Sequence, residues 1–296
     1  MITVMGATGQ VGKQIVGHLL EKGEPVRALG RSEAKLAELR SAGAEALAGD
    51  ANDADFLTHA FRGADAVFAM LPHDPYTPGY DVLQDKLGKT VVKAIEDADV
   101  RHAVCLSSVG ADLPSGTGFI ASLYAQEQGL GALVGTSVLI LRPGYFFENF
   151  YVSLETIRNE GGIADTIPPG VRIPMIATRD IAHAAAHALI ARDWSGIVVR
   201  ELLGPRDLSL AEVANLLGER IGKPDLAYVQ ISDSEMTEAL MGAGIAADFA
   251  ALSIETNHAL SDGTIRSREG RTPENTTSTT FEEFAFELAR AYQAAG

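Results

Sequence analysis

Three glycines near the start of the chain have the spacing of a phosphate-binding turn. Gly6, Gly9 and Gly12 follow the short apolar run Ile2–Met5 and precede a segment with apolar residues at helical spacing. In such a turn Gly6 permits the tight bend, Gly9 lets a pyrophosphate approach the backbone, and Gly12 lets the helix pack on the strand. The first N–H groups and the helix dipole then face the anion. We therefore expect a bound dinucleotide that contacts Gly6, Thr8, Gly9, Gln10, Val11 and Gly12; the alternative is a glycine-rich turn without a ligand.

The end of the second predicted strand distinguishes NADP from NAD. NAD-binding proteins place a carboxylate there, which accepts a hydrogen bond from the ribose 2′-OH. Here the strand at Pro25–Leu29 is followed by Arg31, nineteen residues beyond Gly12. A guanidinium suits a 2′-phosphate, and no acid at this position would repel it. We therefore predict NADP rather than NAD, with a solvated surface arginine as the alternative.

Other candidate contacts stand at the ends of later strands, because ligands of a parallel sheet bind beyond the carboxyl ends of its strands. We expect cofactor contacts at Asp50, Leu71, Pro72, Ser107, Ser108, Tyr145 and Phe146. Ser107 and Ser108 would lie close to the nicotinamide, and the residues from Gly144 to Phe147 would line the same cleft. Asp50 also has a plain structural interpretation, since it can start the helix predicted from Asp53.

Strands and helices alternate over the first half of the chain. Apolar runs predict strands at residues 2–5, 25–29, 44–48, 64–71, 102–107 and 137–141, and helical patterns follow the glycine turn and occupy residues 33–42, 53–61, 80–98 and 120–134. Repeated units of this kind form a parallel sheet with helices on both faces. The sequence therefore predicts an α/β protein with a Rossmann-type, doubly wound parallel sheet.

The second half of the chain is less regular. It predicts helices at residues 151–160, 179–191, 209–221, 234 to about 260 and 281–294, strands at 198–203 and 226–231, and a Gly/Pro-rich loop over Gly161–Pro174. Ser209 and Glu212 have the spacing of a capping box. We expect a NAD(P)-binding Rossmann domain formed by residues 1–150 and about 179–204. A smaller, sequence-interleaved α/β domain would comprise residues from about 151–178 and 205–296.

Composition and charge argue against several functions. A net charge of −15 opposes binding to nucleic acids and anionic membranes. The single cysteine, Cys105, excludes an intrachain disulfide and a cysteine-based zinc site, and its apolar surroundings predict a buried, inert thiol. His183 and His187 are four residues apart but lack a convincing third ligand, so we expect no metal. No signal peptide and no apolar run of roughly 18 residues is present, which predicts a cytoplasmic protein.

Taken together, these motifs resemble those of the NmrA-like branch of the atypical short-chain dehydrogenases/reductases. The resemblance covers nearly the whole chain and is carried by Gly6–Gly12, Leu106–Ala111, Gly116–Gly118, Glu127, Leu141–Gly144, Phe147–Asn149, Leu203–Pro205, Ser209 and Glu212. It implies a Rossmann domain and a small α/β domain with NADP or NAD between them, and an acid near the adenine at Asp50. Some members look like reductases of quinones or dyes. Others look like dinucleotide sensors that bind a regulatory protein.

The usual proton donor of short-chain dehydrogenases is missing from this chain. Those enzymes use a tyrosine whose pKa is lowered by a lysine four residues later on the same helix face. None of the seven tyrosines has a lysine at that distance. Tyr124, on the helix where the family often has a histidine or lysine, is the first candidate for the donor, and His73 in the loop Pro72–Tyr76 is the second. The alternatives are a packing role for Tyr124 and a solvated loop position for His73.

Two functions from different classes fit these features. The first is an NADPH-dependent oxidoreductase for a small apolar acceptor such as a quinone or an enone, with an apolar wall formed by Tyr145, Phe146, Phe147 and Phe150. The second is a non-catalytic sensor of the NADP/NADPH ratio that controls a protein partner, suggested by the missing lysine and the acidic composition. An isomerase or epimerase is disfavoured because it also needs an acid/base pair. Glu148 and Asn149 either bind substrate or, as we favour for Asn149, cap the helix near Tyr151.

Overall fold

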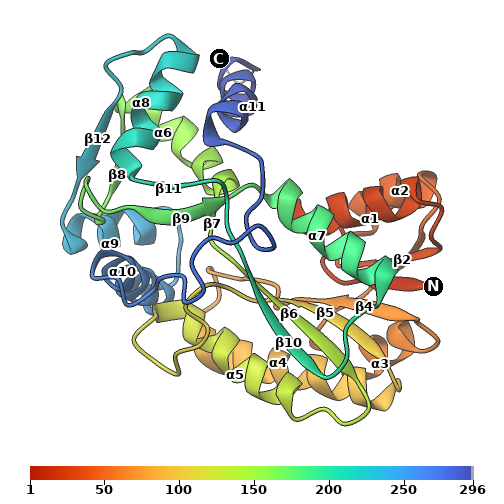
Figure 1. Cartoon of the computed structure of the whole chain (residues 1–296). Coiled ribbons are helices and arrows are strands. Elements are labelled where there is room, and N and C mark those ends of the chain that lie inside the picture. Colours follow the sequence, from red (N-terminus) through yellow and green to blue (C-terminus); the bar gives the residue numbers. More distant parts are fainter. Residues whose placement is uncertain (295–296) are drawn as a thin grey trace.

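A parallel sheet forms the centre of the N-terminal part of the protein. In the computed structural model, which describes residues 1–294, seven strands pair in the order β10-β6-β5-β4-β1-β2-β3, all parallel (Figure 1). They are β1 (Ile2–Val4), β2 (Val26–Gly30), β3 (Glu45–Ala48), β4 (Ala66–Ala69), β5 (His102–Leu106), β6 (Ser137–Pro143) and β10 (Ile197–Leu202). The strand order reverses between β1 and β4, which creates the crevice where doubly wound folds bind ligands. The predicted Rossmann-type fold is confirmed.

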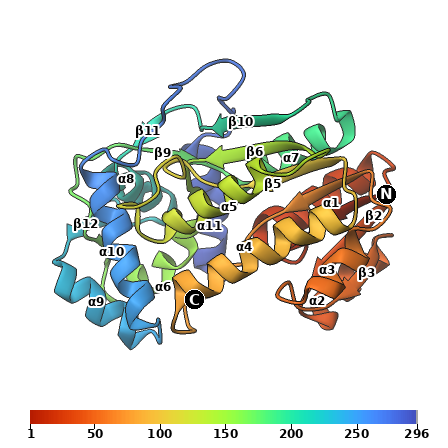
Figure 2. The same ribbon diagram turned by 90° about the horizontal axis from the view of Figure 1, so that it is seen from below.

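Helices cover both faces of this sheet (Figures 1 and 2). One face carries α1 (Gln10–Glu21), α2 (Glu33–Ser41) and α7 (Thr178–Ala191). The other face carries α3 (Ala54–Phe61), α4 (Tyr80–Asp97) and α5 (Ala121–Gly131). The central strands are therefore buried on both sides, and β4, with the sequence Ala-Val-Phe-Ala, has no exposed residue.

The later elements pack together beyond the carboxyl ends of the large sheet. Within the described residues they form a three-stranded sheet in the order β11-β9-β7 and a parallel pair β12-β8. The strands are β7 (Tyr145–Phe146), β8 (Gly162–Asp165), β9 (Ile173–Ile176), β11 (Asp207–Leu208) and β12 (Ala227–Gln230). The helices are η2 (Phe147–Tyr151), α6 (Ser153–Asn159), α8 (Leu210–Ile221), α9 (Asp233–Gly242), α10 (Ala247–Ser261) and α11 (Phe281–Ala294). The short helix η1 (Gly118–Ile120), which precedes α5 in the chain, packs against α10.

The segment Gly161–Pro174 contains more regular structure than its composition predicts. It was expected to be a loop, but its two ends lie in β8 and β9. Both strands are only four residues long, and their partners are distant: β8 pairs with β12, and β9 pairs with β7 and β11. Pairing with distant segments gives these short stretches their extended form, so the local pattern of glycines and prolines could not show it.

Two predicted helix caps have different outcomes. The capping box at the start of α8 is confirmed, because Ser209 Oγ accepts a hydrogen bond from the backbone N–H of Glu212, and the Glu212 carboxylate accepts one from the N–H of Ser209. The capping role expected for Asn149 is wrong, because this residue lies inside η2, which continues directly into α6. Its neighbour Glu148 instead caps α7, with both carboxylate oxygens 3.0 Å from the backbone nitrogen of Thr178.

The chain passes more than once between the two groups of elements. It leaves the large sheet after β6, returns with α7 and β10, and leaves again at β11. This path agrees with a sequence-interleaved arrangement, and the division into domains with the boundaries given above remains our proposal. In residues 1–294, no helix has both the length and the apolar character needed to cross a membrane.

Candidate functional site

The glycine turn has the conformation that a phosphate-binding role requires. Gly6 has a φ of +62°, a left-handed conformation that side chains disfavour. A Cβ atom on Gly12 would overlap the carbonyl oxygen of Gly6 and lie 2.7 Å from its carbonyl carbon, so only glycine lets α1 start this close to β1. Gly9 is the N-cap of α1 and is exposed, and no side chain caps the helix there. The first-turn N–H groups of α1 therefore suit an anionic ligand.

A pocket of about 310 Å³ lies beside this turn, at the carboxyl ends of β1 to β4. It brings together residues that are up to 82 positions apart in the sequence, from Met5 to Leu87. Seven of the residues predicted to form the site line it: Gly6, Thr8, Gly9, Arg31, Asp50, Pro72 and His73. The turn, the second strand and the loop after β4 thus face one space of a size suited to part of a dinucleotide.

Arg31 and Asp50 present opposite charges to this pocket. Arg31 is exposed and, among residues 1–294, forms no ion pair. Its guanidinium is therefore available to a ligand. Asp50 accepts hydrogen bonds from the backbone N–H and the side-chain amide of Asn52, at 2.9 and 3.0 Å. These bonds, with a smaller contribution from Arg31, lower the pKa of Asp50, so its carboxylate is charged at neutral pH.

Several residues that no sequence motif indicates also shape the pocket. Met70 lies against the turn, because a Cβ atom on Gly6 would be only 2.5 Å from its sulfur. Gln84 is buried in α4, and its side-chain nitrogen donates to the carbonyl oxygen of Pro72 at 3.0 Å, which fixes the loop after β4. The sequence carries one usable signal for Gln84: it is a polar residue on the otherwise apolar face of α4, one turn after Tyr80.

His73 lies at one end of the pocket among aromatic side chains. Its ring centroid is 5.7 Å from that of Tyr80, 5.9 Å from that of Phe119 and 4.7 Å from that of Phe249. Its Nδ1 atom is 3.3 Å from the hydroxyl oxygen of Tyr80. The residue keeps an exposed surface, yet the loss of hydration among these rings lowers the pKa of its imidazole. His73 therefore combines an exposed surface with contacts to aromatic rings, and its imidazole is neutral at pH 7.

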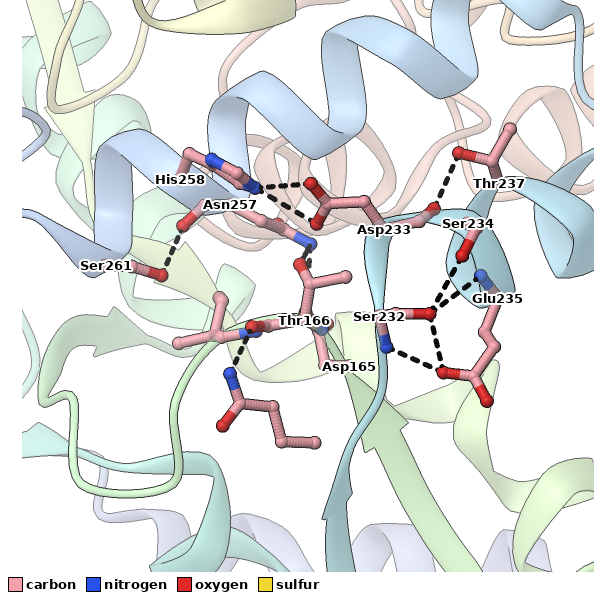
Figure 3. Close-up of polar contacts among 12 residues, drawn as sticks. Asp165, Thr166, Ser232, Asp233, Ser234, Glu235, Thr237, Asn257, His258 and Ser261 are labelled. Carbon is pink, nitrogen blue, oxygen red and sulfur yellow. Dashed lines mark hydrogen bonds and ion pairs between the residues drawn. The ribbon is translucent and has the colours of Figure 1, made fainter.

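Helix α10, which supplies Phe249, forms hydrogen bonds with α4 on the large sheet and with β8 and α9 among the later elements. At its N-terminus the Asp248 carboxylate accepts hydrogen bonds from the backbone N–H groups of Gly79 and Tyr80, at 2.8 and 2.9 Å, and so caps α4. Further along, the amide of Asn257 donates to Asp165 at the end of β8, and Nε2 of His258 lies 3.0 Å from the carboxylate of Asp233 on α9 (Figure 3). These contacts hold the aromatic cluster around His73 in place.

The remaining predicted residues lie outside this pocket. Gln10 is exposed beside the turn, whereas Val11 and Gly12 are buried in the first turn of α1. Leu71 is buried, Tyr145 and Phe146 are half-buried in β7, and Tyr124 is half-buried on α5. Phe147 and Phe150 are buried against Phe281 in the core of the later elements, and neither lines the pocket beside the glycine turn.

Ser107 belongs to a buried polar cluster at the end of β5. Its hydroxyl donates to the Glu127 carboxylate at 2.5 Å, and that carboxylate also receives two hydrogen bonds from Arg142. Ser108 donates to the backbone carbonyl of Val109. Cys105, two residues before Ser107, is buried as predicted, and burial raises the pKa of its thiol to about 12, which leaves it protonated and inert.

Comparison with known proteins identifies the family of this chain. Residues 1–285 match the NmrA-like family, and the chain belongs to it. An NAD(P)H azoreductase of Xenophilus azovorans is 31% identical over 245 residues, which span 83% of this chain and 82% of the azoreductase. A (4-alkanoyl-5-oxo-2,5-dihydrofuran-3-yl)methyl phosphate reductase of Streptomyces griseus is 30% identical over 241 residues, 81% of this chain and 80% of the reductase.

The fold is shared with a solved structure of a reductase. The NADPH complex of an NADPH-dependent quinone oxidoreductase from Escherichia coli superposes with a TM-score of 0.82, covering 97% of this chain and 99% of the other, at 24% sequence identity. At this level of identity the likeness supports the Rossmann-type architecture described above.

Proposed function

We propose that this NmrA-like protein is an NADPH-dependent oxidoreductase that reduces small, largely apolar acceptors such as quinones and enones. The observation that carries the proposal is the pocket beside the glycine turn, where the exposed first turn of α1 and the available Arg31 guanidinium face the same space. The relatives named above agree in chemistry: one is an NAD(P)H azoreductase, and another acts on a dihydrofuranone whose double bond is conjugated to carbonyl groups.

Three of the predicted cofactor contacts, at Gly9, Arg31 and Asp50, have positions that allow specific roles. The backbone at Gly9 and the first turn of α1 would hold the pyrophosphate, and Arg31 would bind the 2′-phosphate by charge-assisted hydrogen bonds. Asp50 would accept from the adenine amine, because its carboxylate lines the pocket and is charged. Bound NADPH supplies a hydride to the acceptor. The protein contributes the positions of the reactants and the exclusion of water from them.

The direct test is oxidation of NADPH by the purified protein in the presence of a panel of acceptors: menadione, 2-cyclohexen-1-one and methyl red, each with NADPH and with NADH. We expect acceptor-dependent oxidation, faster at low NADPH than at the same concentration of NADH. A protein that oxidises neither nucleotide with any acceptor contradicts the proposal. The alternative of a non-catalytic NADP/NADPH sensor with a regulatory protein partner would then gain support, provided that both redox forms still bind.

A further inference from the structure

Helix α4 begins beside the pocket without a capping side chain of its own. Its N-cap is Gly79, which has a φ of +89° and no side chain. The first N–H groups of a helix need acceptors, and the N-cap residue normally supplies one. Leu83, Gln84 and Leu87, near the start of α4, line the pocket beside the glycine turn. The contacts that hold this end of the helix therefore affect the shape of the pocket.

The cap of α4 comes from the later part of the chain. Oδ2 of Asp248, near the start of α10, accepts hydrogen bonds from the backbone N–H groups of both Gly79 and Tyr80, at 2.8 and 2.9 Å. Its negative charge also suits the positive end of the α4 dipole. Just before α10, the N–H of Ala246 donates to the carbonyl oxygen of Pro75 at 2.9 Å. The start of α10 thus binds both the loop after β4 and the helix that follows this loop.

An aromatic contact continues this attachment to the pocket itself. The buried ring of Phe249 has its centroid 4.7 Å from that of His73 and 4.8 Å from that of Tyr80. His73 lines the pocket together with its neighbours Pro72 and Asp74. One wall of the pocket therefore rests on α10.

The C-terminal half of α10 is attached to the later elements (Figure 3). The side-chain amide of Asn257 donates to Asp165 at the end of β8, at 2.8 Å, and His258 contacts Asp233 on α9. A continuous helix of 15 residues is a stiff element, so α10 fixes the loop after β4 relative to β8 and α9. Movement of the later elements away from the large sheet would break the bonds to Asp248 and release this loop.

We propose that Asp248 is a positioning residue for the cofactor: it caps α4 from the later part of the chain, holds one wall of the pocket in place and so slows the release of NADPH. This role rests on the proposed function, which places the adenosine end of NADPH in this pocket. Among the described residues, Asp248 is not one that lines the pocket, so it acts through the loop that ends at Gly79. A wall that is fixed before binding favours the bound state, whereas a wall that is displaced part of the time weakens binding by that fraction.

The test measures the dissociation rates of NADPH and NADH by stopped-flow fluorescence in three variants. Asp248→Ala removes the cap, whereas Asp248→Asn keeps a side-chain oxygen that can accept from the same N–H groups. Ser209→Ala is the matched control, because it removes the cap of α8, a helix of which no residue lines the pocket within the described chain.

We expect Asp248→Ala to release both nucleotides faster, by roughly 2- to 30-fold, the factor that corresponds to the loss of a helix cap. The factor should be the same for NADPH and NADH, because the two share the adenosine that this wall encloses. Asp248→Asn should release both nucleotides nearly as slowly as the unmodified protein. Ser209→Ala should have a lower melting temperature without faster release.

Several outcomes would overturn the positioning role. Asp248→Ala could melt at a lower temperature and yet release both nucleotides at the unmodified rate, which would make the cap purely structural. Equally fast release from Asp248→Ala and Asp248→Asn would reject the cap as the cause, and equally fast release from Ser209→Ala would assign the effect to a general loss of stability.

A second variant serves if Asp248→Ala does not fold. Phe249→Leu keeps the cap and removes the ring that contacts His73, so it should also release both nucleotides faster, and an unchanged rate would reject the proposal. If NADPH binds but no variant changes its release, the reductase function stands without the positioning role. If the unmodified protein binds neither nucleotide, the proposed function and the positioning role fail together.

Discussion

Glu127 and Arg142 form a buried ion pair between α5 and the end of β6. Arg142 Nε lies 2.9 Å from Glu127 Oε1, and a second hydrogen bond joins the guanidinium to Oε2. The Glu127 side chain is only 5% exposed, and the hydrogen bonds that Arg142 donates to it raise the pKa of the Arg142 guanidinium above its ordinary value. Because Ser107 also donates to this carboxylate, the pair fixes the ends of β5 and β6 against α5.

We expect Glu127→Gln to reduce the free energy of unfolding by about 3–5 kcal/mol, because it leaves the half-buried Arg142 charge without its partner. Urea denaturation followed by circular dichroism measures this. Asp85→Asn is the matched control: it breaks the Asp85–Lys89 pair on the surface of α4, which should change the same free energy by less than about 1 kcal/mol. Equal losses of unfolding free energy in the two variants would show that the buried pair stabilises the fold no more than the surface pair does.

Arg31→Ala should weaken NADPH binding selectively. Loss of a charge-assisted contact of about 1.5–3 kcal/mol corresponds to a rise in the dissociation constant for NADPH of roughly 10- to 150-fold. The dissociation constant for NADH should stay the same, since NADH has no 2′-phosphate. Titration followed by nucleotide fluorescence gives both constants. Arg40→Ala, at the other end of α2, is the control and should affect neither nucleotide. A similar loss for NADPH and NADH would contradict the role assigned to Arg31.

Two glycines of the same helix should respond oppositely to alanine. Gly12→Ala pushes a methyl group into the carbonyl group of Gly6, so it should lower the melting temperature and abolish NADPH binding. A Cβ atom on Gly17 meets nothing within 4 Å, so Gly17→Ala should raise helix stability by up to about 1 kcal/mol and leave binding unchanged. Thermal melts with and without NADPH measure both effects. NADPH binding by Gly12→Ala with unmodified affinity would show that α1 can move away from β1 at no cost.

The lowered pKa of His73 predicts a pH dependence of stability. Unfolding exposes the imidazole to water and returns its pKa to about 6.5, so the unfolded chain binds this proton at a higher pH than the folded protein. The contribution of His73 is therefore absent well above pH 6.5, and it destabilises the fold increasingly as the pH falls from 6.5 toward the folded-state pKa. His73→Gln should lose less stability than the unmodified protein between pH 7.5 and pH 5. Identical losses would mean that the ring stays hydrated despite Tyr80 and Phe249.

Local sequence patterns predicted the parts of the site that depend on local geometry. The turn needs a left-handed backbone conformation at Gly6 and no Cβ atom at Gly12. Glycine meets both requirements, so the two positions could be recognised from the sequence. Arg31 directly follows β2, so its position at the carboxyl end of that strand could be predicted once the bounds of the strand were recognised. The roles predicted for these residues in ligand binding remain proposals.

The rest depended on contacts between distant segments. Glu148 was considered a substrate ligand or a cap for the next helix, but it caps α7, thirty residues later. The aromatic surroundings of His73 come from η1 and α10, and no local pattern around residue 73 could show that Phe119 and Phe249 pack on its ring. Side chains that obtain their partners through the tertiary fold have no signature at sequence level.

The position of β10 at the edge of the large sheet affects how this protein can fold during synthesis. Residues 1–143 contain six of its seven strands within the described chain, yet the side of β6 that β10 covers is open until residue 202 has been made. At ribosomal rates of about 5–20 residues per second, the nascent chain spends roughly 3–12 s with that edge unprotected. Premature termination in this interval would release a chain with an exposed apolar strand, a substrate for chaperones or a seed for aggregation.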